Sequence, residues 1–168
     1  AMFLETLRVV AAVAALAVGT SVMGHDRHDD DDDHRDRTPS PAYFVDAAKL
    51  PFDGLAGLPS KRLWGVHKRA GYRIEVPVQW NGKLVMWAHG FRGDPATNPA
   101  ALELTVDNHP LRAYLLANGY AWAASSYSRN AYDPSSGAID THALTKLFKR
   151  VVGEPKLVYI TGASMGGH

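Results

Sequence analysis

A serine flanked by glycines is the residue of this sequence best suited to do chemistry. Residues 162–166 read Gly-Ala-Ser-Met-Gly, a G-x-S-x-G pattern, and the apolar run Leu157 to Ile160 comes shortly before them. A serine hydroxyl is a weak nucleophile, and a tight strand-to-helix turn presents it to a base and a substrate. Such a turn strains the backbone and brings neighbouring chain close, which favours glycine on either side. The pattern predicts Ser164 as a nucleophile.

A second candidate segment, residues 89–94, reads His-Gly-Phe-Arg-Gly-Asp and follows the apolar run Leu84–Ala88. Acyl transfer develops negative charge on an oxygen, which two backbone N–H donors can stabilise; removing one such donor costs about 3 to 4 kcal/mol. One donor would be Met165, the residue after the nucleophile. The other would come from this loop, with Phe91 the first candidate and Arg92 the next.

His89 and Gly90 would shape this loop rather than react. A glycine lets the backbone approach a substrate closely. The alternative is an ordinary glycine-rich connection in which His89 only fixes the conformation. The residues alone leave both interpretations open.

Strand and helix patterns place these two segments in an alternating order. Strands are predicted over 62–68, 71–78, 84–88, 120–126 and 157–160. Helices are predicted over 110–119, with Asn108 as N-cap, and over 139–152. Asn81-Gly82 predicts a tight hairpin turn between the second and third strands. Alternating strands and helices imply an α/β fold with a mostly parallel central sheet and flanking helices.

The helix predicted over 139–152 is amphipathic. One side carries basic residues, and the other is expected to face the core. The residues of the expected core side are Ile139, Leu144, Leu147, Phe148 and Val151.

Composition narrows the possible functions. The chain has 168 residues, about one domain, and a net charge of +1 without a concentrated basic face, so nucleic acid is not an expected partner. It has no cysteine, which excludes disulfides, a thiol nucleophile and Cys-ligated zinc. No cofactor is expected.

Residues 1–24 are expected to be a signal peptide. Arg8 precedes the apolar run Val9–Val18, which is too short to span a bilayer, and small residues follow. Cleavage is predicted after Gly24, with Ser21 as the alternative site. A secreted or periplasmic protein without a stable membrane anchor follows; an N-terminal hydrophobic helix of the mature fold is the competing interpretation.

Residues 25–41 are expected to be a disordered Asp/His-rich linker, because the run His25–Arg37 contains no apolar residue. Its histidines and carboxylates could hold a divalent ion loosely, but no rigid spacing enforces this, so no metal site is predicted. Residues 42–61, rich in proline and glycine, are expected to form a loop-rich extension on the domain.

Three segments together resemble the α/β-hydrolase superfamily, specifically its extracellular bacterial esterase and peptidase-like members. They are Trp80-Asn81-Gly82, His89-Gly90-Phe91 and Gly162–Gly167. The resemblance covers about residues 62–168, the N-terminal half of such a domain. It implies a serine esterase acting through an acyl-enzyme on a small-molecule or polymer ester. A serine aminopeptidase-like enzyme and a noncatalytic binding protein of the same fold are the alternatives.

The resemblance also implies that the triad acid and histidine follow the nucleophile in the chain, beyond His168. His168 is expected to point away along the elbow helix, and His109 and His142 to be packing or surface residues. The acids Asp94, Asp133 and Asp140 precede the nucleophile and do not match the expected position.

A chain that ends here is expected to leave the strand at 157–161 as an exposed apolar edge, which promotes aggregation. We therefore expect the 168-residue piece alone to be poorly soluble and inactive on simple esters.

Overall fold

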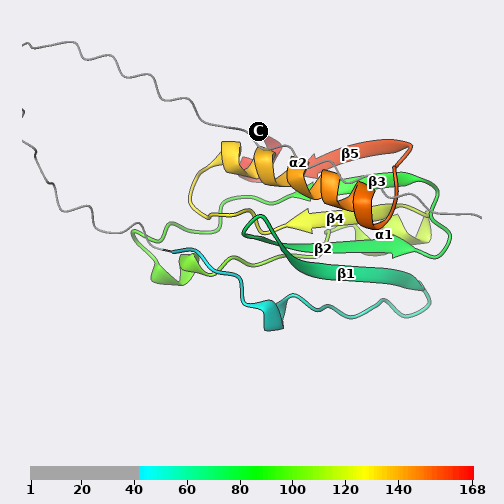
Figure 1. Cartoon of the computed structure of the whole chain (residues 1–168), viewed down its shortest axis with the longest axis horizontal. Helices are drawn as coiled ribbons and strands as arrows, with labels where there is room; N and C mark the ends of the chain where they lie inside the picture. Colours follow the sequence, from blue (N-terminus) through cyan, green and yellow to red (C-terminus); the bar gives the residue numbers. More distant parts are fainter. Residues whose placement is uncertain (1–41) are drawn as a thin grey trace, which may run out of the picture. The chain divides into compact units, whose positions relative to one another are not determined.

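A five-stranded sheet with order β1-β2-β4-β3-β5 forms the centre of the computed structural model, which describes residues 42–168 (Figure 1). The predictions of a signal peptide at 1–24 and of a linker at 25–41 lie outside the described residues. The strands are β1 (Ser60–His67), β2 (Ala70–Pro77), β3 (Lys83–Ala88), β4 (Ala121–Ser125) and β5 (Leu157–Gly162). The helices are α1 (Arg112–Ala117) and α2 (Pro134–Val151), with 3-10 turns η1 (Ala47–Lys49), η2 (Pro99–Leu102) and η3 (Ser164–Gly167).

The predicted α/β class, a central sheet with flanking helices, is confirmed, but the sheet is mixed rather than mostly parallel. β1 pairs with β2 and β2 with β4 in antiparallel sense, whereas β3 pairs in parallel with both β4 and β5. The parallel half therefore holds the three strands whose carboxyl ends meet at one edge. Among residues 42–168, no helix has the length and apolar character needed to cross a membrane.

The predicted hairpin between β2 and β3 is wrong. The hairpin of this sheet joins β1 to β2, and its turn uses two left-handed residues, Lys68 with φ 50° and Arg69 with φ 71°. Asn81-Gly82 does form a turn, with Gly82 at φ +83°, but its backbone bonds reach Gly119 and Lys156 rather than closing a hairpin. The turn carries the chain to the far side of β4.

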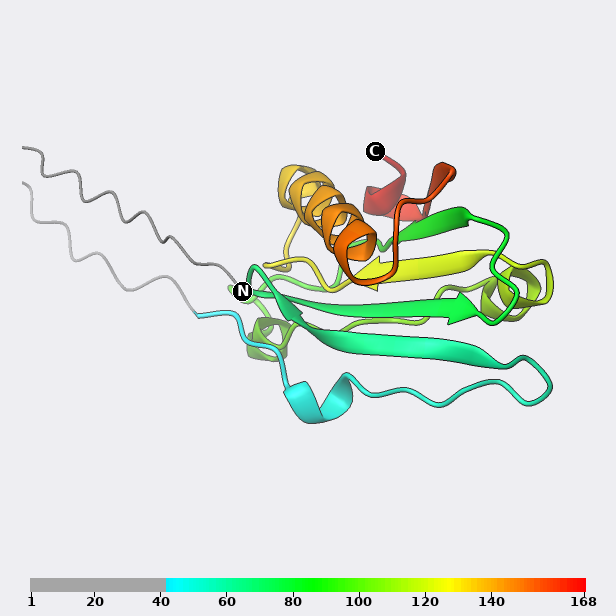
Figure 2. The ribbon, with the colours of Figure 1, turned by 45° about the vertical axis from the view of Figure 1, so that its right-hand side comes forward.

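The two faces of the sheet pack against different layers. Alternate residues Leu84 and Met86 of β3 join the cluster that α2 covers through Leu144 and Phe148. Val85, between them, joins the opposite cluster, which includes residues of α1 and of the segment before β1. Figure 2 shows α2 lying across its face of the sheet.

Both helices depart from their predicted form. α2 begins at Pro134 because the Asp133 side chain accepts the Ser136 N–H as an N-cap, a signal the sequence carries. Ile139, expected in the core, is 65% exposed, whereas Asp140 is buried. Asp140 takes the inward position because it accepts hydrogen bonds from the backbone N–H and the hydroxyl of Ser128.

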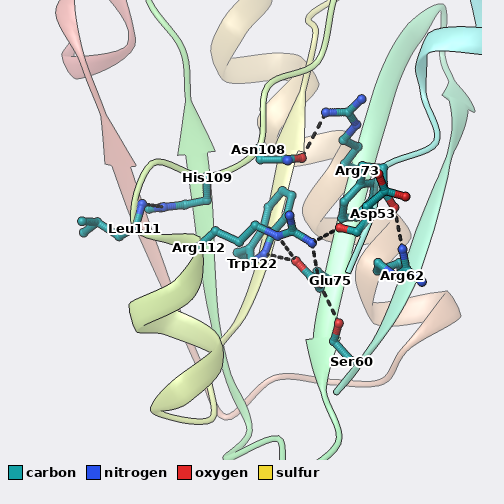
Figure 3. A network of polar contacts seen from close by, with 11 residues as sticks. Asp53, Ser60, Arg62, Arg73, Glu75, Asn108, His109, Leu111, Arg112 and Trp122 are labelled. Carbon is teal, nitrogen blue, oxygen red and sulfur yellow. Dashed lines mark hydrogen bonds and ion pairs between the residues drawn. The ribbon is translucent and has the colours of Figure 1, made fainter. Parts of the chain in front are cut away.

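Asn108 does not cap α1, which begins at Arg112 without a side-chain cap. The Asn108 carboxamide oxygen instead accepts from the guanidinium of Arg73, at 3.0 Å (Figure 3). The Asn108 oxygen, predicted to cap a helix locally, therefore accepts a hydrogen bond from a residue distant in the sequence.

A buried carboxylate on β2 ties α1 and β4 together (Figure 3). Glu75 is fully buried and accepts from Arg112 Nε at 2.5 Å, from Trp122 Nε1 at 2.8 Å and from Ser60 Oγ at 2.6 Å. A buried charge is tolerated only when it is paired and hydrogen-bonded in this way.

Two arginines fasten the segment before β1 to the sheet. Arg73 donates to the carbonyls of Lys49 and Leu50, both at 2.8 Å, and Arg112 donates to the carbonyl of Asp53 at 2.5 Å. The guanidinium carbons of Arg73 and Arg112 lie 5.2 and 5.1 Å from the centre of the Phe52 ring. Cation–π contact adds to these hydrogen bonds.

Replacing Arg112 by alanine is expected to lower the free energy of unfolding by about 3 to 5 kcal/mol, because Glu75 is left as an unpaired buried charge. The matched control is Lys149→Ala, which breaks the exposed Lys149–Glu154 pair and is expected to cost under about 1 kcal/mol. Urea unfolding measures both. The double variant Glu75→Gln with Arg112→Met should be more stable than Arg112→Ala, and equal losses for Arg112→Ala and Lys149→Ala would contradict the argument.

Candidate active site

Ser164 occupies a sharp turn between β5 and η3. β5 ends at Gly162, Ala163 is extended with φ −133° and ψ 143°, and Ser164 has a left-handed φ of 55°. A positive φ in a residue with a side chain is strained and needs surrounding contacts to hold it. Ser164 is an exposed residue, so the turn leaves it accessible in the described part of the chain.

The glycines on either side of Ser164 are required by close backbone packing. A Cβ on Gly162 would lie 2.0 Å from the carbonyl oxygen of Gly166, and one on Gly166 would lie 2.1 Å from that of Ala88. Both neighbours are main-chain atoms, which cannot turn aside as a side chain can. Gly167 differs, because no atom lies within 4 Å of a Cβ placed there.

The loop after β3 lies directly against the nucleophile candidate. β3 and β5 are parallel neighbours with Ala88 opposite Gly162, so their carboxyl ends meet. A Cβ on Gly90 would lie 3.0 Å from Ser164 Cβ and 3.6 Å from Ser164 Oγ. The structure therefore brings together the two segments that the sequence singles out.

His89 is buried and fixes the base of this loop. Its Nδ1 lies 2.7 Å from the carbonyl oxygen of Gly90 and its Nε2 3.1 Å from that of Ser126. The ring stacks on Tyr127, with centroids 3.9 Å apart and planes 24° apart. Burial, aided by the charge of Arg92, lowers the pKa of His89. A neutral ring donates to one of the two carbonyls at a time.

The remaining predicted loop residues lie in different environments. The Met165 side chain is buried beneath the turn, whereas Phe91 is 52% exposed. Arg92, the second oxyanion candidate, has its guanidinium engaged by the carbonyl and hydroxyl oxygens of Thr105 and by the carboxylate of Asp107. Its side chain therefore serves to anchor the loop.

His109 braces β5 one residue before the turn, a role that no sequence signal indicated. Its Nδ1 accepts from Leu111 N–H at 3.0 Å, and its Nε2 lies 2.9 Å from Thr161 Oγ1 (Figure 3 shows the Leu111 bond). The Thr161 hydroxyl donates to Met86 O at 3.1 Å, so it accepts from the ring. The arrangement selects the neutral imidazole protonated on Nε2, and burial lowers its pKa to about 4.

The other histidines near the site, within residues 42–168, are not hydrogen-bonded to Ser164. His168 Nδ1 lies 3.4 Å from Tyr132 Oη, and His142 lies exposed on α2. Within residues 42–168, no hydrogen bond joins a histidine to Ser164 Oγ.

Each of the three acids before the nucleophile holds local structure. Asp94 accepts from Ala96 N–H in a turn, and Asp133 caps α2. Asp140 binds Ser128. In the part of the chain that the structure describes, no group of three or more potential metal ligands gathers.

A cavity of about 800 Å³ lies between α2, β5 and η3, beneath the turn rather than at the Ser164 hydroxyl. Its lining includes Ala138, Thr141, Thr145, Val158, Ile160 and Met165 but not Ser164. β5 pairs only with β3 among the described strands, and its residues 157–160 are exposed. The cavity belongs to this uncovered face of β5.

No family model and no curated protein matches the chain. It is similar to the solved structure of an arylesterase, with 20% identity, covering 72% of this chain and 40% of that one, at a TM-score of 0.44. It is also similar to a carboxyl esterase of the fungus Tuber melanosporum (15% identity, 77% and 43% covered, TM-score 0.44) and to a thermostable esterase from Pseudomonas putida (18%, 72% and 39%, 0.39). The chain therefore spans less than half the length of these proteins. The likeness is distant, so function has to be inferred from the residues of the site.

Replacing Gly166 by alanine is expected to lower the free energy of unfolding by about 3 kcal/mol or more, because the new carbon meets the carbonyl oxygen of Ala88. Gly167→Ala is the matched control one residue later and should stay within about 0.5 kcal/mol. Urea unfolding followed by tryptophan fluorescence measures both. Similar stabilities for the two variants would show that the backbone at Gly166 has room for a side chain.

His109 is expected to make stability fall in acid. Its pKa is about 4 in the folded chain against 6.5 as its ordinary value, so between these pH values the unfolded chain binds more protons. The free energy of unfolding should therefore rise with pH across this window, with a slope from His109 of up to about 1.4 kcal/mol per pH unit. The contribution of His109 to the free energy of unfolding is complete above about pH 6.5 and is lost as pH falls toward 4.

The variant His109→Asn tests this, because an amide oxygen can accept from Leu111 N–H without titrating. It is expected to be less stable at pH 7 but to lose less stability between pH 7 and pH 5 than the wild type. Urea midpoints at the two pH values give the difference. Equal losses in the two proteins would rule out His109 as the titrating group.

Proposed function

We propose that this protein is a serine hydrolase that cleaves carboxylic esters through an acyl-enzyme on Ser164. The observation that carries the proposal is the strained, exposed Ser164 at the carboxyl end of β5, with Gly90 of the β3 loop packed on its side chain. A strained residue held by close packing is typical of a functional site. An adjoining loop of backbone donors is what acyl transfer requires.

The chemistry would proceed in two halves. Ser164 Oγ attacks the ester carbonyl carbon as a base takes its proton, and the tetrahedral intermediate expels the alcohol, which receives that proton. Water then attacks the acyl-enzyme, the base takes a proton from it, and the acid leaves as Ser164 is reprotonated. The N–H groups of Met165 and Phe91 would hold the oxyanion in both halves.

Two features support these donors. Burial of the Met165 side chain fixes the residue that follows the nucleophile. Phe91 lies between Gly90, which touches Ser164, and the anchored Arg92, so its backbone position is defined. His89 would act as a positioning residue through the Gly90 carbonyl.

The base and the acid of the triad would come from outside residues 42–168. His89 and His109 are engaged with backbone and hydroxyl groups, His168 faces Tyr132, and none of them bonds to Ser164. The family resemblance puts the acid and then the histidine after His168. The signal-peptide pattern in the sequence of residues 1–24 supports the proposal of a secreted or periplasmic enzyme.

Treating the complete gene product with a fluorophosphonate probe tests the nucleophile. Labelling is expected on the peptide that contains Ser164, because the probe reacts with activated serines. The variant Ser164→Ala should abolish labelling and lower kcat for ethyl acetate by about 10⁴-fold or more. The control Ser135→Ala, which removes an exposed serine of α2, should leave both unchanged.

Folded protein that does not react with the probe, or Ser164→Ala protein that keeps its turnover, would contradict the proposal. Circular dichroism and thermal melting of each variant establish that the protein under test is folded.

A further inference from the structure

Two large aromatic side chains are exposed on loops at the edge of the sheet that carries Ser164. Phe91 is 52% exposed in the loop after β3, and Tyr132 is 61% exposed in the loop after β4. The third aromatic residue of these loops, Tyr127, is buried against His89 and serves the core. Exposed aromatic side chains near a site often bind apolar groups, because each can bury a large area.

The backbone around Phe91 is held firmly although its ring is free. Gly90, on one side, packs against Ser164. On the other side, the guanidinium of Arg92 is mostly buried and bonded to Thr105 and Asp107. The Phe91 ring is therefore exposed although the backbone on both sides of it is held in place.

The loop after β4 holds Tyr132 in a similar way. Asn130 is buried, and its Nδ2 donates to the carbonyls of Ala101 and Glu103 at 2.7 and 3.2 Å. Ala131 has a left-handed φ of 69°, and Asp133 caps α2. Strained backbone of this kind persists only where surrounding contacts determine it, and such places are often functional.

Hydrogen bonds join these loops to each other and to the turn that bears Ser164. Ala131 N–H donates to Gly93 O at 2.8 Å, which ties the Tyr132 loop to the Phe91 loop. Tyr132 Oη lies 3.4 Å from His168 Nδ1, and the two rings meet edge to face with centroids 6.1 Å apart. Tyr132 thus contacts the residue that follows η3, and Phe91 adjoins the glycine that packs on Ser164.

Both arginines beside the two rings are paired. Arg92 bonds to Asp107, and Arg129 lies 3.4 Å from the carboxylate of Asp133. Neither arginine offers an uncompensated positive charge to a substrate carboxylate. A ligand without a carboxylate is therefore favoured.

We propose that Phe91 and Tyr132 together bind an aromatic or comparably large apolar group of a neutral ester whose carbonyl lies at Ser164. The proposal rests on the proposed function and adds the substrate class. The two rings would bury the apolar group while the ester reaches the nucleophile between them.

Three neutral esters test this on the complete gene product: ethyl acetate, benzyl acetate and ethyl phenylacetate. We expect kcat/KM to be higher for at least one aromatic ester than for ethyl acetate. That preference should fall roughly three- to tenfold in Phe91→Ala and in Tyr132→Ala, the range expected for a lost aromatic contact. Phe91→Ala keeps its backbone N–H. The control is Tyr114→Ala, which removes an equally exposed ring from α1 and should keep the preference.

Binding of the ketone 4-phenyl-2-butanone gives a readout that needs no turnover. In the Ser164→Ala background, its affinity measured by NMR titration should fall by the same factor in Phe91→Ala and Tyr132→Ala, and not in Tyr114→Ala. A preference and a ketone affinity that match those of the Tyr114→Ala control would overturn the proposal. A different outcome would refute only the catalytic function. In it, the wild-type protein is not labelled by the fluorophosphonate, but ketone binding is still weakened by Phe91→Ala and by Tyr132→Ala.

Discussion

The close approach of the β3 backbone to the Ser164 turn is the constraint on which the site depends. The carbonyl oxygen of Ala88 occupies the space that a side chain on Gly166 would need, and it also accepts from Ala163 N–H at 3.3 Å. This contact follows from the parallel pairing that sets Ala88 opposite Gly162. A single pairing register therefore forms the turn and brings His89 and Gly90, the first residues after β3, close to it.

Hydrogen bonds and ion pairs between segments then stabilise the arrangement of strands and loops that this pairing register sets. Thr161 is braced by His109 from the segment before α1, and Gly93 accepts from Ala131 in the loop after β4. Farther from the site, the buried pair of Glu75 and Arg112 joins β2 to α1. The Glu75–Arg112 pair satisfies a carboxylate that would otherwise be buried unpaired, so the frame is specified by hydrogen bonding as well as by apolar packing.

The sequence predicted the parts of this molecule that local residues decide. The apolar runs of β3, β4 and β5 and the turn at Ser164 depend on neighbours in the chain, and the structure has them at nearly the expected positions. Strand partners depend on distant residues, which is why Asn81-Gly82 suggested a hairpin that does not form. Asp140 lies inside and Ile139 outside because Ser128, twelve residues from Asp140, supplies the partner. The brace from His109 to Thr161 spans 52 residues and has no motif.

Strain at Ser164 needs support from the residues around it. Among the described strands β5 has one neighbour, β3, and residues 157–160 are exposed on its other side. Within the described residues, the contacts that hold the left-handed conformation of Ser164 include the carbonyl of Ala88, Gly90 and, through Thr161, His109. All three contacts lie on or beside the segments that would bind the substrate. The contacts that hold the conformation of Ser164 are therefore also the ones that would shape the proposed binding site, so disturbing one would disturb both.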